Sequence, residues 1–480
     1  MDVDEDAASN PVDARPTSQR LQTPPPCSHE VTLVGAAELH EKQRWQPTAL
    51  HPGPAFKTIE WSTDGTTVIA STASKSIVTY VLPADLLSPR EEDDNEDGDD
   101  GDSDYKPYHR SLTCHGRLRF GIAPTALAPA PYFSLAEPWS QTVLVGFRDR
   151  PIQLYPLFPP EDDNDDDDNP IPPTPLASYS LIKQETEAYL PPMALLWPQP
   201  GTHFVVGTKS LLALFDSSRT SNDPPLLRIP TVTYTGGGFA LGLKGMVSAL
   251  AGGSDKSSQL TASGTWTRGI GLYDLTRSGG VCTAHWKVAD DAEHTKGDGV
   301  VQVVWSPCGR YLVVNERKSK GMLVYDVRGS GRLLCTLAGR SARSTQPIRC
   351  ATYASATSSG FELWSGTDSG SVVVYENVGS REGVVEPTWQ WQAHGQTAVG
   401  GTAMHSSGSV VATCSSSLPV VDQDDEDVSE SDDESDSSDD SDSKSSSDSS
   451  VGSSRSRSGM DVSDPSINIW SLLPLKAQGE

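Results

Sequence analysis

The chain has 480 residues, and its 64 acidic and 37 basic side chains give a formal net charge of −27. Thirty of the acids lie in three runs at 91–104, 161–168 and 422–442, so the remainder is nearly balanced, with 37 basic and 34 acidic residues. The sequence shows no signal peptide, no apolar run of transmembrane length and no C-x-x-C pair among its seven cysteines, so we expect an intracellular protein with reduced thiols and no membrane association.

Segments rich in charge or proline are expected to lack a fixed structure. Residues 1–27 combine Pro with Asp, and each acidic run is too polar to bury the apolar surface that would offset the entropy of ordering it. We therefore predict a disordered N-terminal tail at 1–27. We also predict disordered acidic loop inserts, two in the connections after the first two repeats and one inside the last repeat, at about 88–108, 158–172 and 420–464.

A short strand that ends in an aromatic residue recurs along the chain. Each copy has an aliphatic residue or methionine three positions before the aromatic, and four copies have an acid directly after it. An apolar strand closed by a turn glycine precedes most copies, at Gly65, Gly201, Gly309 and Gly408. The aromatic residues are Tyr80, Tyr155, Phe215, Tyr273, Tyr325, Tyr375 and Trp470.

One blade of a WD-repeat propeller has a characteristic order of elements: a strand, a turn, a second strand, a bend, and a third strand that ends in an aromatic residue followed by an acid. A β-sandwich would not require the unit to return seven times, so we predict an all-β, seven-bladed WD40-type β-propeller over 28–476. The segment Glu30–Gly35 is expected to pair beside Ile467–Trp470 and complete the last blade. The predicted blades are 56–83, 114–156, 193–216, 245–275, 299–327, 347–376, and 397–416 joined to 466–471.

The sequence contains no HExxH, GxSxG or GxxxxGK[ST] motif, and its ten histidines show no metal-ligand spacing. The glycine-rich segment Gly236–Gly245 lacks the preceding strand of a phosphate-binding loop, so a flexible connection between blades is the better interpretation. We therefore predict that the protein is not an enzyme and needs no cofactor or metal.

Basic residues are concentrated between Arg310 and Arg349, where nine Lys and Arg accompany two acids. These charges could be ordinary solvated loop charges, or they could contact RNA phosphates, with Arg side chains stacking on bases. Arginines of blades two and four occupy the corresponding bends. The candidate RNA-binding residues are Arg148, Arg150, Arg268, Arg317, Lys318, Lys320, Arg340, Arg343, Gln346 and Arg349.

Several motifs resemble the telomerase Cajal body protein family of WD-repeat proteins and its fungal relatives, from about Phe56 to Trp470. The most specific are the Arg-x-x-Pro-Ile of 148–152, the Gly-Thr-x-x-Arg-x-x-Gly-Leu-Tyr of 264–273, and Gly-Arg followed by Thr-Gln at 339–346. The sequence departs from the animal pattern at Ser344–Pro347, and its charged inserts are similar to those of the fungal branch.

The resemblance implies a nuclear scaffold that binds small RNAs. We expect a monomer without catalytic activity, with the cytoplasm as a further location. Its implied partner is a small nuclear RNA or H/ACA-type RNA with its ribonucleoprotein, and proteins could bind the propeller faces. Animal members bind box H/ACA RNAs of Cajal bodies and telomerase RNA, whereas fungal relatives are associated with mRNA splicing. The departures favour RNA-particle binding over a role in telomerase itself.

Two other functions and one modification are compatible with the sequence. The segment Tyr325–Arg328 (YDVR) is similar to the docking motif of cullin-RING ubiquitin ligase adaptors, although the repeat places an acid there in any case. A propeller that binds only proteins is the other alternative. The acidic serine tract Ser429–Ser450 is either a phosphorylation site that competes with RNA or an inert solubilising segment.

Overall fold

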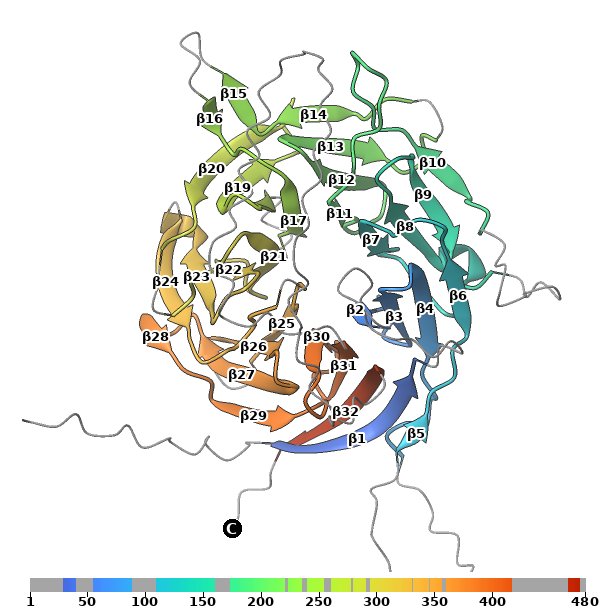
Figure 1. Ribbon diagram of the computed structural model, residues 1–480, viewed down its shortest axis with the longest axis vertical. Coiled ribbons are helices and arrows are strands. Elements are labelled where there is room, and N and C mark those ends of the chain that lie inside the picture. The colour runs from blue at the N-terminus through green and yellow to red at the C-terminus, as the bar shows by residue number, and fades with distance from the viewer. Residues whose placement is uncertain are drawn as a thin grey trace, which may run out of the picture.

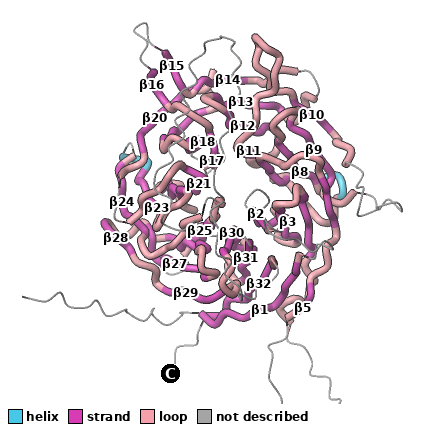
Figure 2. Tube along the Cα trace, in the orientation of Figure 1, coloured by secondary structure: helices cyan, strands magenta, loops and turns pink. Residues whose placement is uncertain are grey.

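The computed structural model describes residues 29–39, 55–88, 109–159, 173–220, 223–234, 240–253, 260–277, 279–290, 294–329, 331–344, 346–355, 360–416 and 465–474. Seven sheets, each with four antiparallel blade strands, surround a central axis as the blades of a propeller (Figure 1), which confirms the predicted fold class. Figure 2 shows that strands dominate the described residues, whose only helices are the short 3-10 turns η1 (Pro138–Ser140) and η2 (Val327–Gly329).

Each blade has four strands, counted from the axis outwards. Blades one and two contain β2 (Phe56–Trp61), β3 (Thr67–Thr72), β4 (Ser76–Val81) and β6 (Gly116–Arg119), then β7 (Ala126–Pro129), β8 (Thr142–Gly146), β9 (Ile152–Pro156) and β10 (Ala177–Tyr179). Blades three and four contain β11 (Ala194–Leu196), β12 (His203–Thr208), β13 (Leu211–Asp216) and β14 (Leu227–Pro230), then β17 (Val247–Gly252), β18 (Leu260–Thr265), β19 (Gly269–Asp274) and β20 (Val281–Lys287).

The remaining strands complete the ring and add short pieces to it. Blades five, six and seven contain β21 (Val300–Trp305), β22 (Tyr311–Glu316), β23 (Met322–Asp326) and β24 (Arg332–Leu337), then β25 (Cys350–Ala354), β26 (Phe361–Gly366), β27 (Ser371–Val378) and β29 (Trp389–Gln392), then β30 (Ala398–Met404), β31 (Val410–Ser416), β32 (Ser466–Pro474) and β1 (His29–Glu38). Outside the blades, β5 (Arg110–Ser111) pairs with β1, β28 (Gly383–Val385) pairs with β24, and β15 (Val232–Tyr234) and β16 (Ala240–Gly242) form a hairpin.

The N-terminal strand closes the ring, as the sequence predicts. Strand β1 runs antiparallel to β32, with Leu33 opposite Trp470 and Gly35 opposite Ile469. The pairing covers the edge that β32 would otherwise expose to other chains. Blade seven is therefore built from both ends of the described chain, which Figure 1 shows as blue and red ribbons side by side.

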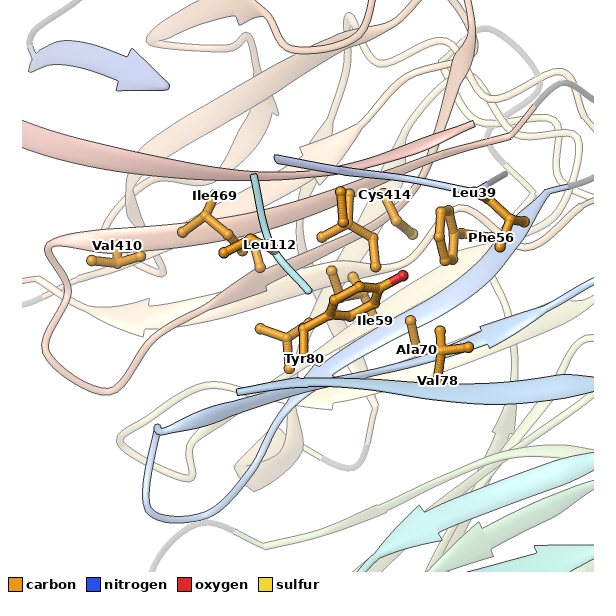
Figure 3. Close-up of a cluster of buried hydrophobic side chains, with 14 of the residues drawn as sticks. Leu39, Phe56, Ile59, Ala70, Val78, Tyr80, Leu112, Val410, Cys414 and Ile469 are labelled. Carbon is orange, nitrogen blue, oxygen red and sulfur yellow. The ribbon is translucent and has the colours of Figure 1, made fainter. Parts of the chain in front are cut away.

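The recurring aromatic residues fill the spaces between blades. Tyr80 of blade one lies in one cluster with Val410 and Ile469 of blade seven (Figure 3), and each of the other six aromatics packs in the same way against the blade before its own. All seven are less than a tenth exposed. Burial of one such side chain contributes roughly 1.5–3 kcal/mol, so the sequence repeat is the repeat of these interblade contacts.

The turn glycines recur because the turns need a left-handed backbone. Gly65, Gly201, Gly309 and Gly408 each follow a first strand and have φ between 67° and 94°. A side chain at such a position is strained, whereas glycine has no Cβ to clash. The motif seen in the sequence therefore marks the turn between the first and second strands of a blade.

The predicted blade boundaries are wrong at the outer strands. Residues 114–119 were expected to begin blade two, but β6 pairs with β4 and forms the outer strand of blade one. Outer strands have little apolar pattern because one edge and much of one face meet solvent; in β20, five of seven residues are exposed. Each blade therefore ends with an outer strand that follows the strand of the recurring aromatic residue, and it does not end at that residue.

This correction also moves the acidic inserts. The first two lie between the third and outer strands of blades one and two, not in connections between blades, because β4 leads to β6 and β9 leads to β10. The third lies between β31 and β32 inside blade seven, as expected. The tail 1–27 and nearly all residues of the three insert ranges lie outside the described residues, so their disorder stays a prediction.

Candidate nucleic-acid interface

Strand direction decides which loops share a face of the propeller. Neighbouring strands of each blade are antiparallel, so the bends between second and third strands lie on the same side as the links from an outer strand to the next blade. We call this side the bend face. The opposite side, called the turn face, carries the turns between first and second strands and the links from third to outer strands.

All ten candidate residues lie in segments of the bend face. Arg148 and Arg150 lie between β8 and β9, and Arg268 lies between β18 and β19. The bend between β22 and β23 carries Arg317, Lys318 and Lys320, and the link between β24 and β25 carries Arg340, Arg343, Gln346 and Arg349.

The basic stretch of the sequence is divided between the two faces. Arg310 lies in the turn between β21 and β22, and Arg328 lies in the link between β23 and β24. Arg332 is the first residue of β24, at the end of that link. These three residues are therefore on the turn face. Their neighbours in sequence at 317–320 are on the bend face, so the stretch is not one continuous surface.

Blades four, five and six bring one group of candidates together. The bend and the link touch, because the Lys318 N–H donates to the Ser344 carbonyl at 3.3 Å and Ser319 forms a β-bridge with Ala342. Arg343, which is exposed, therefore lies beside the 317–320 bend. Blade two, with Arg148 and Arg150, is on the other side of the ring (Figure 1), so the structure does not join it to this group.

An aromatic side chain that sequence reasoning missed belongs to this group. Trp266 lies in the bend of blade four, is 40% exposed, and has the Arg317 guanidinium carbon 5.6 Å from its ring centroid. The same guanidinium lies 3.2 Å from Asp298, and the Lys318 ammonium lies 3.9 Å from that carboxylate. The sequence offered one indication of this role, namely that Trp266 lies in the same bend as the candidate Arg268.

Arg268 serves the packing of blades four and five. Its Nε donates to Glu316 Oε1 at 2.7 Å, its Nη2 donates to Glu316 Oε2 at 3.2 Å, and Nη1 donates to Asp290. These partners, Glu316 first, raise the pKa of Arg268 above its ordinary value. Because the Glu316 side chain is only 2% exposed, the guanidinium balances a buried charge and is not available to a phosphate without a large cost.

Arg340 is a buried residue and is removed from the candidate set. It is 1% exposed, and it donates to Asn315 Oδ1 at 2.8 Å and to the Ile348 carbonyl at 2.9 Å. Burial lowers its pKa. The expectation that it contacts phosphate fails because sequence position cannot tell a loop arginine that turns inward from one that faces solvent.

Gln346 and Arg349 also make structural contacts. Gln346 is buried; its Nε2 donates to the Phe56 carbonyl at 3.2 Å and its Oε1 accepts from Ser416 Oγ at 2.7 Å, so it joins blades one and seven to the link after blade five. Arg349 Nη1 lies 3.3 Å from Glu60 Oε1. The Gln346 side chain is therefore not accessible to RNA, whereas the Arg349 side chain is 37% exposed and is paired with Glu60.

The Glu60–Arg349 pair lies in the central channel. A cavity of about 290 Å³ is lined by both residues and by innermost strands of blades one to five. Burial raises the pKa of Glu60, while Arg349 lowers it. Within the described residues no three His, Cys, Asp or Glu side chains gather as a metal site would need, and no described helix is long and apolar enough to span a membrane.

Arg150 and Arg148 form a small separate site on blade two. The Arg150 guanidinium carbon lies 5.2 Å from the Phe147 ring centroid, and its Nε lies 3.4 Å from Asp149. Arg148 is exposed. These residues remain candidates, but the surface of blades four to six combines more charges with an aromatic ring.

Comparison with known proteins gives distant relatives. No family model matches the sequence. The chain is 24% identical over 296 residues, 61% of its length, to guanine nucleotide-binding protein negative regulator 1 of Schizosaccharomyces pombe. It is 22% identical over 374 residues, 77% of its length, to telomerase Cajal body protein 1 of Homo sapiens, and 26% identical over 210 residues, 44% of its length, to protein SWT21 of Eremothecium gossypii.

The matched segments span only part of each relative, namely 64%, 58% and 46% of their lengths in the same order. The match to telomerase Cajal body protein 1 nevertheless extends over most of the propeller. This relative belongs to the family that the motifs at 148–152 and 264–273 resemble. The chain is therefore similar, as a distant relative, to the telomerase Cajal body protein family of WD-repeat proteins that its motifs resemble.

Proposed function

We propose that this protein is a non-catalytic scaffold of the nucleus that binds a small RNA of a ribonucleoprotein through its bend face. The observation that carries the proposal is the surface of blades four to six, where Trp266, Arg317, Lys318, Lys320 and Arg343 lie together. We call these five residues the basic-aromatic patch. Phosphates would meet its charges, and unpaired bases could meet its ring.

The relatives support the class of partner. The name of telomerase Cajal body protein 1 refers to telomerase, which is a ribonucleoprotein enzyme, and to the Cajal body, which is a nuclear body. A box H/ACA-type RNA, telomerase RNA or a spliceosomal small nuclear RNA would each offer phosphates beside unpaired bases. The departures at Ser344–Pro347 and the acidic inserts favour a particle other than telomerase.

Salt dependence of RNA binding tests the proposal. Replacing Lys320 and Arg343 with Ala should weaken binding and make the slope of log affinity against log salt shallower by about 0.7 for each phosphate that the variant no longer neutralises, because fewer counterions are released. The measurement is electrophoretic mobility shift of a small structured RNA over a salt series.

A matched pair on the other face provides the control. Arg328→Ala with Arg332→Ala removes two exposed arginines of the same basic stretch from the turn face, and should leave the slope unchanged. Equal effects of the two pairs would show that binding follows total charge and not the bend face. Crosslinking and sequencing of RNA from native protein, beside the Lys320→Ala, Arg343→Ala variant, would then identify the RNA.

The ligase-adaptor alternative gains nothing from the structure. In the YDVR segment, Asp326 accepts the Arg328 N–H at 3.0 Å, as Asp274 accepts the Thr276 N–H at 3.0 Å in blade four. The acid therefore has the same role in a blade without the motif. The interpretation of YDVR as an ordinary blade element is the better supported one.

A protein partner is the second candidate, supported by one observation on the turn face. Trp139 is 68% exposed and stacks on Tyr132, with ring centroids 5.7 Å apart. Exposed tryptophan is typical of protein interfaces. If native protein carries no RNA after gentle purification, this surface becomes the first to test.

A further inference from the structure

The bend of blade four holds Trp266 in a fixed place. Its backbone N–H donates to the Met246 carbonyl at 3.1 Å, and Thr267 Oγ1 donates to the Lys244 carbonyl. The next residue, Arg268, has φ of 62° and is anchored by Glu316. The backbone on both sides of Trp266 is therefore fastened to neighbouring loops, while 40% of the residue remains exposed.

A large exposed aromatic residue at such an anchored position is not needed for packing. The blades hold their cores with aromatics that are less than a tenth exposed, and Trp266 is in none of the seven clusters. A rigid indole on the surface loses little conformational entropy when another flat group stacks on it.

The charges that pair with one another in and beside the bend of Trp266 are balanced, which restricts the ligand. Arg317 and Lys318 share the carboxylate of Asp298, and Arg268 is matched by Glu316 and Asp290. Among these side chains three are basic and three are acidic. A duplex bound through dense phosphate contacts would gain little here, whereas stacking does not depend on net charge.

We propose that Trp266 is a stacking platform for an unpaired base of the bound RNA, with Arg317 over the ring and Lys318 beside the adjoining phosphate. This inference rests on the proposed RNA-binding function and specifies its ligand as a single-stranded segment. Arg317 already lies 5.6 Å from the ring centroid, so a base, the indole and the guanidinium can form one stack.

Trp266→Ala in the full-length protein tests the inference. Binding of a single-stranded oligonucleotide should weaken about 5- to 150-fold, the range expected when one base–aromatic stack is removed. Trp266→Phe should restore part of the affinity. Because neither variant removes a charged side chain, the salt slope should stay that of the parent protein. Binding of a fully paired duplex of the same length should also be unchanged.

Trp139→Ala is the matched control, since it removes another exposed tryptophan from the turn face and should leave RNA affinity unchanged. The inference is overturned if Trp266→Ala binds the single strand as tightly as the parent, or if single strand and duplex lose affinity equally. Should Lys320→Ala, Arg343→Ala still flatten the salt slope, the proposed function would stand without the platform. Failure of the parent protein to bind any RNA would overturn both.

Discussion

Three of the four acids that follow the recurring aromatics stabilise turns. Asp216, Asp274 and Asp326 each accept the backbone N–H two residues later, at 2.9 to 3.0 Å. Hydrogen bonds lower the pKa of all three carboxyl groups. The largest cause is the side-chain hydrogen bond from Ser218 for Asp216, from Thr276 for Asp274 and from Arg328 for Asp326. In these three blades the aromatic residue makes a contact between blades and the acid after it stabilises the adjoining turn.

His394 is a buried histidine at the boundary of blades six and seven. It is 5% exposed, its Nε2 lies 2.8 Å from Thr413 Oγ1, and its Nδ1 lies 3.1 Å from Ser466 Oγ. Burial lowers its pKa to about 3. The folded protein therefore holds the ring neutral at pH values where the unfolded chain, with a pKa near its ordinary value of 6.5, takes up a proton.

This histidine should make stability depend on pH. Because the folded-state pKa is the lower one, its contribution is complete above pH 6.5 and is lost as the pH falls toward 3, by about 1.4 kcal/mol per unit. Urea unfolding of the parent and of His394→Asn at several pH values measures the difference. Carboxyl groups titrate in both proteins, so parallel curves would contradict the assignment.

At the scale of elements, the link between β24 and β25 joins blades five and six through Arg340. The guanidinium reaches Asn315 of β22, the carbonyl of Ile348 and, at 3.4 Å, the carbonyl of Gly366 in β26. One strand from each of two blades, and the link itself, thus depend on one side chain. No acidic group is hydrogen-bonded to it in the described residues.

Arg340→Ala should lower the free energy of unfolding by about 3 kcal/mol, because it leaves buried acceptors without a donor and opens a cavity. Arg343→Ala, three residues further and exposed, should change it by less than about 0.5 kcal/mol. Chemical denaturation of the two variants gives the comparison. Similar midpoints would show that the buried arginine is replaceable.

At the scale of the whole molecule, closure depends on pairing between residues far apart in sequence. Removal of residues 29–39 deletes β1, which exposes the edge of β32 and uncovers the cluster that Ala37 and Leu39 join. We expect a lower melting temperature and self-association through the new edge. Size-exclusion chromatography and thermal unfolding test this, with a variant lacking only residues 1–28 as the control that keeps the strand.

The sequence was sufficient for the fold because propeller blades repeat their contacts. Tyr80 and its six counterparts recur in sequence since each fills the same interblade space, and Gly65 and its counterparts recur since each turn needs positive φ. Strands with exposed faces, such as β6 and β20, carry no comparable constraint, so their positions could not be predicted.

The candidate site shows the limit of local information. Arg340 and Arg343 are three residues apart in one loop, yet one is buried and the other exposed. Trp266 comes beside Arg317 only because blades four and five are neighbours in the ring. Spacing along the chain therefore determined the number and order of blades and the ring closure. Which charges face solvent, and which aromatic joins them, was decided by tertiary packing, because burial and pairing depend on residues distant in sequence.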